Sequence, residues 1–280
     1  MKIDGVDGKT TVKTVHKPRA RQMAFWNSVL PQIIALQSKP KQTVKEKYGI
    51  LTWSLAIAAS DQRATKECFY NIARFPKVLG CIDGSLIPIM RPSDDEEAVY
   101  VCRKGFHAVN VQAVCDAELR FTSVVSKWPG SVHDSFMLQN SSIGQFMETA
   151  GIDGWLLGDS GYACRPWLLT PKVNLTTPSE DWYNTAHCRT RNTVERAFGL
   201  LKSRFRCLHK SGGCLPFNPK KCHQVVYATC HLHNFCINLR LPAPPTLEDL
   251  THEDGISYQG PLNDGFKVRW FQSVIKNCFS

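Results

Sequence analysis

Three acidic side chains stand where a carboxylate could do chemistry. Asp83 lies within the apolar run VLGCIDGSLIPIM, in which an ionised carboxylate is costly unless it is paired or bound to a cation. Asp159 follows the apolar run WLLG, and Glu195 is the only acid of residues 186–206. Carboxylates are hard oxygen ligands that suit Mg²⁺ or Mn²⁺, so the three residues are candidate ligands of a divalent cation.

Each of these acids, taken singly, also has a structural explanation. Asp83 precedes a glycine, and an aspartate in that position is commonly a turn residue. Asp159 could cap the turn that follows it. Glu195 could form an ion pair with Arg191, four residues earlier, which is worth a few tenths of a kcal/mol. Both interpretations stay open for each residue alone.

Strands are predicted around the two aspartates. Runs rich in branched apolar residues predict strands at residues 78–90, 109–114, 121–125 and 154–159. A polar turn at residues 116–118 joins the second and third, so the first three strands should form an antiparallel meander. Asp159 would then lie at the carboxyl end of the fourth strand, where open sheets place their sites.

Helices are predicted by apolar residues at helical spacing over residues 50–75, 131–146, 186–206 and 223–241. Within the first stretch, Asp61 is the expected cap of a second helix. Ser131 or Asp134 is the expected cap of the next one. The order of strands and helices describes an α/β fold with a mixed central sheet flanked by helices.

The sequence around the acids is similar to that of a known family. Between Asp83 and Asp159 lie 75 residues, and between Asp159 and Glu195 lie 35. Two strand aspartates and a later helical glutamate with that last interval resemble the DDE site of transposases and integrases. Five segments resemble, in order, the nuclease of PIF/Harbinger-type transposases and of their domesticated animal relatives. They are FPKVLGCIDGSLIPI, YVCRKGFHAVNVQAVCDAELRF, WPGSVHDSFML, WLLGDSGYACRPWLLTP and NTVERAFGLLKSRFRCL. The resemblance covers residues 69–239.

This resemblance implies a ribonuclease-H-like fold and a metal-dependent DNA endonuclease. It assigns Asp83, Asp159 and Glu195 as catalytic metal ligands, with Asp134 as a further candidate ligand that could equally be a helix cap. Two Mg²⁺ or Mn²⁺ ions about 3.5–4 Å apart would serve phosphodiester cleavage. The family also implies a Myb-like DNA-binding partner protein and location in the nucleus, with the cytoplasm as a second location.

Two other interpretations remain. A domesticated, non-catalytic descendant could keep the nuclease fold as a DNA- or protein-binding module. Soft metal ligands are also clustered, at Cys222, His223, Cys230, His231, His233 and Cys236. Zinc sites usually pair ligands in two separated clusters, whereas these residues lie on one predicted helix, which favours a packing role. The chain has no glycine-rich phosphate loop and no Gly-x-Ser-x-Gly motif.

Charge and composition divide the chain into three parts. The formal charge is +10, which favours a polyanionic partner, and residues 1–47 hold ten lysines and arginines against three acids. We expect a basic, partly helical arm at 1–60, the nuclease domain at 61–241 and a weakly structured tail at 242–280. Twelve cysteines without an apparent signal peptide favour a reducing compartment. No apolar run approaches a membrane span of about 18 residues.

Overall fold

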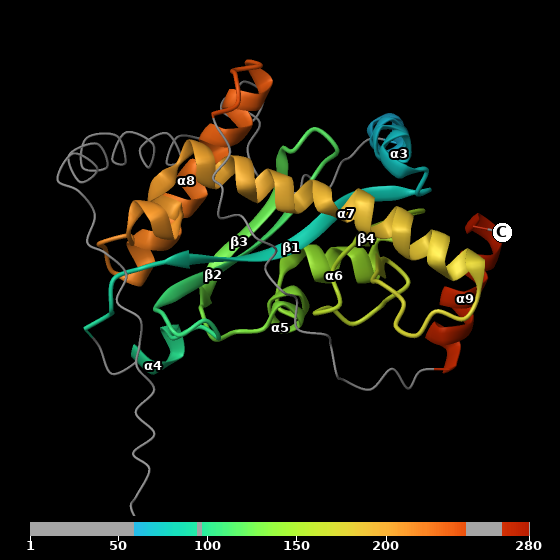
Figure 1. Ribbon diagram of the computed structural model, residues 1–280, viewed down its shortest axis with the longest axis horizontal. Helices are drawn as coiled ribbons and strands as arrows, with labels where there is room; N and C mark the ends of the chain where they lie inside the picture. The colour runs from blue at the N-terminus through green and yellow to red at the C-terminus, as the bar shows by residue number, and fades with distance from the viewer. Residues whose placement is uncertain (1–58, 94–96, 245–264, 280) are drawn as a thin grey trace, which may run out of the picture.

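A mixed five-stranded sheet forms the centre of the computed structural model, which describes residues 59–93, 97–244 and 265–279 (Figure 1). Its strands are β1 (Val78–Pro88), β2 (Ala108–Cys115), β3 (Phe121–Pro129), β4 (Trp155–Leu157) and β5 (Leu168–Leu169). The order across the sheet is β3-β2-β1-β4-β5. The first three strands form the predicted antiparallel meander, and β4 joins β1 in parallel. This confirms the predicted α/β fold with a mixed sheet, which is consistent with a ribonuclease-H-like nuclease.

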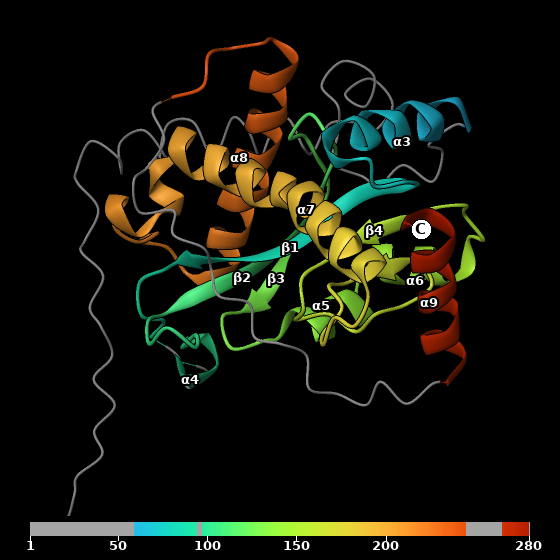
Figure 2. The same ribbon diagram turned by 45° about the vertical axis from the view of Figure 1, so that its right-hand side comes forward.

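Helices cover both faces of the sheet, because successive strand residues point to opposite sides. On one face Cys81 and Ile87 contribute to the larger core, which the helices α3 (Ala59–Ala73), α7 (Pro178–Arg204), α8 (Pro219–Asn238) and α9 (Gly265–Phe279) also build. On the other face Ile82 and Val114 pack with α5 (Asp134–Gln139) and α6 (Ser142–Thr149). Both views show α7 running across the sheet (Figures 1 and 2). A short helix, α4 (Glu97–Tyr100), precedes β2.

The strand β1 changes its neighbours halfway along its length. Its first residues pair in parallel with β4, ending at Cys81 opposite Leu157, whereas its residues from Cys81 to Pro88 pair with β2 in the antiparallel sense. From Ile82 to Ile87, no described strand lies on the β4 side of β1. Open α/β sheets form their binding crevices where the strand order switches in this way. Asp83 therefore lies just past the point where the pairing of β1 with β4 ends.

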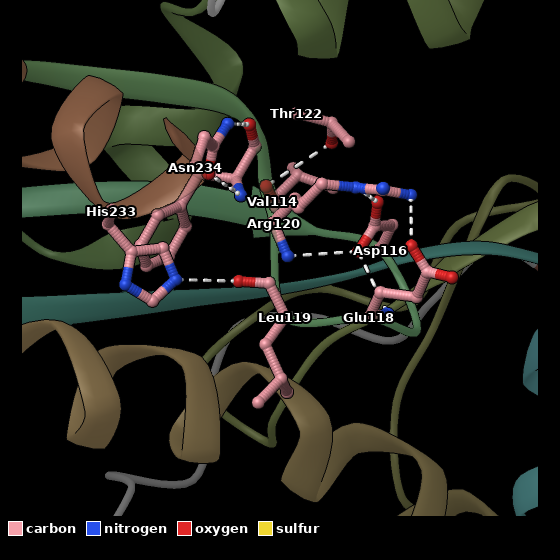
Figure 3. Close-up of polar contacts among 9 residues, drawn as sticks. Val114, Asp116, Glu118, Leu119, Arg120, Thr122, His233 and Asn234 are labelled. Atoms are coloured by element: carbon pink, nitrogen blue, oxygen red, sulfur yellow. Dashed lines mark hydrogen bonds and ion pairs between the residues drawn. The ribbon is translucent and has the colours of Figure 1, made fainter. Parts of the chain in front are cut away.

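The turn between β2 and β3 is tied to α8 by side chains that bond to backbone (Figure 3). Asn234 accepts a hydrogen bond from the Phe121 N–H at 2.8 Å and donates one to the Phe121 carbonyl at 2.7 Å. His233 Nε2 lies 2.8 Å from the Leu119 carbonyl oxygen. Within the turn, Asp116 Oδ1 accepts from the backbone N–H of Glu118 and of Arg120. These bonds hold the meander against the helix.

Several expected helix ends are wrong. The helix α3 contains Asp61 within its length, so this residue is no cap, and residues 50–58 lie outside the described part. The single helix expected at 131–146 is two, α5 and α6. The N-cap of α5 is His133 without a side-chain bond, so neither Ser131 nor Asp134 caps it, and Ser141 caps α6.

The long helix α7 begins eight residues earlier than expected. Thr177 and Glu180 form a reciprocal capping box, and Pro178 takes the first helical position, where its missing N–H costs nothing. The helix α8 likewise begins earlier, at Pro219, with Asn218 as its cap, and ends at Asn238.

The C-terminal residues differ most from expectation. We expected residues 242–280 to be weakly structured, but residues 265–279 form α9. Its Phe279 is 2% exposed and lies against Phe75, Tyr183 and Trp182, with ring centroids 5.0, 5.4 and 5.8 Å away. The expectation fails because α9 draws its stability from packing on α7, which local composition does not report. Among the described helices, none is long and apolar enough to cross a membrane.

Candidate active site

Asp83 points from the middle of β1 toward α7. Its side chain is 17% exposed, and Oδ1 accepts the N–H of Gly84 at 2.8 Å. Its Oδ2 lies 3.4 Å from Arg191 Nη1 on α7. The bond to Gly84 is the local turn-like contact that an aspartate before glycine commonly makes, yet the residue is inside a strand. The other carboxylate oxygen is therefore directed at the helix.

Asp159 follows β4, just where this strand ends. Its Oδ1 accepts the N–H of Gly161 at 3.0 Å, so the residue does stabilise the turn after it. The preceding Gly158 has no room for a side chain, because an added Cβ would lie 2.9 Å from Tyr162 and 3.3 Å from Ile82. This close approach brings the chain after β4 against β1. It places Asp159 near enough to Asp83 for their charges to interact.

Asp134 reaches the same place from the opposite face of the sheet. Its carboxylate lies against Gly84 so closely that an added Cβ there would be 2.2 Å from Oδ1. Two amides of β2 hold the segment: Asn110 Nδ2 lies 3.3 Å from Asp134 Oδ1, and Gln112 Nε2 donates to the Asp134 carbonyl at 3.0 Å. Gln112 Nε2 is also 3.0 Å from the buried Tyr162 hydroxyl. Contacts with β2 thus position Asp134, which does not cap the helix.

Glu195 joins the acids through an arginine. It lies on α7 with Oε1 2.5 Å from Arg191 Nη2, in the i, i+4 ion pair that its spacing allows. The same guanidinium contacts Asp83. Arg191 is 15% exposed in its side chain, and its Nε is buried with no hydrogen-bond partner among the described residues. One buried cation therefore bridges the strand acid and the helix acid.

The acids crowd one another, and their pKa values reflect this. Burial raises the pKa of Asp83 well above its usual range, with Asp159 and Asp134 raising it further and Arg191 opposing the rise. Burial also raises the pKa of Asp159, against the opposing charges of Arg191 and of the exposed Arg103. Like charges in a poorly solvated place disfavour ionisation unless a cation offsets them. The site therefore has an excess of negative charge.

The donor chemistry of this site fits a divalent cation. As the side chains stand, no three carboxylates, imidazoles or thiols of the described residues are grouped closely enough to ligate one ion. Two buried amide oxygens near Asp134, Asn110 Oδ1 and Gln112 Oε1, nevertheless lack a hydrogen-bond partner in the described structure. Orphaned oxygens beside crowded carboxylates suit a hydrated hard cation. Asp83, Asp134 and Asp159, with Glu195, would hold it.

The geometry also shows residues that sequence reasoning missed. Asn110 and Gln112 were not considered, although their spacing in the run AVNVQAVC puts two polar side chains on one face of a buried strand. That alternation was the available signal. Arg191 was considered only as an ion-pair partner of Glu195, whereas it also contacts Asp83. The exposed Arg103 affects Asp159 from the turn before β2.

Of the candidate zinc ligands, three take part in other contacts. His233 bonds to the Leu119 carbonyl, His223 Nδ1 lies 3.1 Å from Ser126 Oγ, and Cys222 Sγ donates to the Phe217 carbonyl at 3.2 Å. The helix that carries them, α8, packs along β3. These contacts support the packing role that we favoured.

Comparison with known proteins agrees with the fold. The model of the family described as "DDE superfamily endonuclease" matches residues 82–234, which include Asp83, Asp134, Asp159 and Glu195. The match covers more than half of the chain, and the chain belongs to this family. The resemblance to Harbinger-type nucleases is confirmed by relatives at about 40% identity.

Curated relatives place the chain more closely. The human protein named "Putative nuclease HARBI1" is 42% identical over 177 residues, which are 62% of this chain and 50% of that protein. A Xenopus laevis protein of the same name is 35% identical over 219 residues, 77% of this chain and 62% of that protein. "Protein ALP1-like" of Arabidopsis thaliana is 26% identical over 212 residues, 69% of this chain and 51% of that protein. The chain spans about half the length of the mammalian relatives. No solved structure matches it.

Proposed function

We propose that this chain is a divalent-metal-dependent DNA endonuclease of the Harbinger transposase class. The observation that carries the proposal is that Asp159 and Asp134 lie near enough to Asp83 to raise the pKa of its carboxyl group, with Asp134 directly against the neighbouring Gly84. Membership of a family of endonucleases supports the same reaction. Hydrolysis of a phosphodiester bond by a two-metal DDE mechanism needs this kind of carboxylate cluster.

Each residue of the site would have a distinct task. Asp83, Asp159 and Glu195 would hold two Mg²⁺ or Mn²⁺ ions, with Asp134 as a further ligand. Such ions, when bound, activate a water for attack on phosphorus and stabilise the leaving oxygen. The amides of Asn110 and Gln112 would keep Asp134 oriented. Because Arg103 is exposed beside Asp159, it would contact a phosphate of the strand that is cut.

Replacement of one acid tests the proposal. Purified protein should nick DNA with Mg²⁺ or Mn²⁺ and not with a chelator. The substitution Asp83→Asn should lower the rate of cleavage by at least about a thousandfold, because a two-metal site that lacks one ligand loses its activated water. The DNA affinity of this variant should be equal to that of the wild type or higher. For both proteins the affinity should fall steeply as the salt concentration rises, because lysines and arginines that bind phosphates release counterions from the DNA. Asp153→Asn, an exposed acid paired with Lys77, is the matched control. Wild-type cleavage by Asp83→Asn contradicts the proposal.

One observation favours a second candidate function. Arg191 contacts both Asp83 and Glu195 and offsets part of their charge, so these two acids have a partner without a metal ion. The chain would then be a non-catalytic DNA- or protein-binding module that keeps the nuclease fold. Salt-sensitive DNA binding by the wild type, with no cleavage under Mg²⁺ or Mn²⁺, would support this candidate over the enzyme.

We also propose that the protein acts in the nucleus, with the cytoplasm as a second location, beside a Myb-like DNA-binding partner. Family resemblance supports both statements. The basic run HKPRAR at residues 16–21, which lies outside the described residues, is suited to a nuclear address or to phosphate contacts.

A further inference from the structure

An exposed aromatic ring lies beside the candidate site, together with a lysine. Phe136, in the first turn of α5, is 49% exposed and packs edge-on against Trp128, with ring centroids 5.3 Å apart. Lys127 Nζ lies 4.9 Å from the centroid of the Trp128 ring and 3.3 Å from the Asn140 carbonyl oxygen. We call Lys127, Trp128 and Phe136 the aromatic ledge.

The aromatic ledge lies close to the acids. Trp128 on β3 is the strand partner of Asn110 on β2, and Asn110 in turn contacts the carboxylate of Asp134. Phe136 follows Asp134 by two residues in α5. The aromatic ledge therefore lies on the face of the sheet that carries Asp134, and its strand β3 is two positions from β1, about 10 Å between strand backbones.

We propose that the aromatic ledge binds an unpaired nucleobase of the DNA strand held at the acids, with the base stacked on Phe136 and an adjacent phosphate near Lys127. The inference rests on the proposed function, because it takes DNA as the substrate. It adds a binding site that the acids do not provide. An aromatic ring stacks on any base, whereas bases inside a duplex are covered by their neighbours.

Size and charge favour a nucleobase over a protein partner. A stable protein interface buries at least about 1,000 Å², far more than a single half-exposed ring can provide. One ring matches one base. A lysine next to the ring suits the phosphate that accompanies every base, and the net charge of +10 suits a polyanion.

The test uses the full chain and a single-stranded oligonucleotide with 2-aminopurine at one internal position, in chelator so that no cleavage occurs. Stacking should quench the fluorescence of 2-aminopurine. We expect Phe136→Tyr to keep the quenching and Phe136→Leu, which keeps an apolar side chain without the ring, to lose it and to bind about tenfold more weakly. Trp182→Leu, at an equally exposed aromatic on α7, is the control and should behave as the wild type. Thermal melting checks that all variants fold.

The outcomes separate this inference from the proposed function. Wild-type quenching and affinity in Phe136→Leu would overturn the inference, as would an equal loss in Trp182→Leu. Lack of cleavage by the wild type with Mg²⁺ or Mn²⁺, together with the expected quenching pattern, would overturn the nuclease function and leave the aromatic ledge as a DNA-binding surface.

Discussion

Arg191 contacts two of the carboxylates that would hold a metal ion in the proposed mechanism, Asp83 and Glu195. Burial works against its charge, but Asp83 and Glu195 outweigh that effect and raise the pKa of the guanidinium. A buried cation that contacts two carboxylates is stable only while both partners stay in place. A metal ion bound by these acids would therefore compete with Arg191, and the arginine would have to give up at least one contact.

Replacing Arg191 should consequently strengthen metal binding. In Arg191→Gln the uncompensated acids destabilise the metal-free protein and attract Mn²⁺ more strongly, by about tenfold for each 1.4 kcal/mol of repulsion that the ion relieves. Calorimetric titration with Mn²⁺ measures the affinity, and melting with and without Mn²⁺ measures the stabilisation. Arg189→Gln, an exposed arginine on the same helix, is the control. Equal Mn²⁺ affinity in Arg191→Gln and wild type would show that Arg191 does not compete with the ion.

The helix α8 and the β2–β3 turn act as one unit, because Asn234 bonds to both backbone groups of Phe121. Both residues are buried, so neither backbone group can turn to water if the amide is removed. Phe121 also packs its ring against Phe198 of α7, at 5.3 Å between centroids. The turn thus connects two helices that cover the same face of the sheet.

Asn234→Ala should destabilise the protein by about 1–3 kcal/mol, because it leaves a buried N–H and a buried carbonyl without partners. Asn234→Asp keeps an acceptor for the Phe121 N–H, but it places a carboxylate oxygen against the Phe121 carbonyl oxygen, which repels it. This variant should therefore be no more stable than Asn234→Ala. Urea denaturation measures both. Asn238→Ala, an exposed residue on the same helix, should change the free energy of unfolding by less than about 0.5 kcal/mol. A similarly small change in Asn234→Ala would rule out this role.

Two buried histidines link the stability of the fold to pH. Each bonds through Nε2 to a carbonyl, His187 to Leu169 and His233 to Leu119, and each has a buried Nδ1 without a partner in the described structure. Burial lowers the pKa of both to about 4. A proton on Nδ1 would need an acceptor that the surroundings do not offer. Both imidazoles are therefore neutral in the folded protein at pH 7.

The stability that these histidines contribute should be lost as pH falls. The unfolded chain takes up their protons near pH 6.5 and the folded protein only near pH 4, so the loss occurs between these values. Because the pKa values of Asp83 and Asp159 are raised, these carboxyl groups add stability as pH falls and oppose the effect of the histidines. The contribution of one histidine is therefore measured by comparing a variant with the wild type. The free energy of unfolding of His233→Gln should fall less between pH 7 and pH 5 than that of the wild type, by about 1 kcal/mol or more. The exposed His133→Gln should follow the wild type, and an equal fall in His233→Gln would contradict the argument.

The sheet could be predicted from the sequence because its signals are local. Branched apolar runs, a polar turn and their order along the chain were enough for the meander and for β4. Helix ends were less predictable. The start of α7 depended on the pairing of Thr177 with Glu180, and α9 on a face of α7 far away in sequence. Such elements are stabilised by contacts that a short window of sequence does not contain.

The candidate acids could be chosen from the sequence because the resemblance to DDE nucleases added to what residue type, burial cost and spacing indicate. The arrangement of these acids in space could not be predicted from the sequence. Asp83 projects from β1 toward α7, whereas Asp134 lies against the next residue, Gly84, from the other face, which is possible only because Gly84 has no side chain. The bridging role of Arg191 and the support from Asn110 and Gln112 also arise from pairing between distant segments. Electrostatic coupling falls with distance in space, not along the chain, so it required the folded structure.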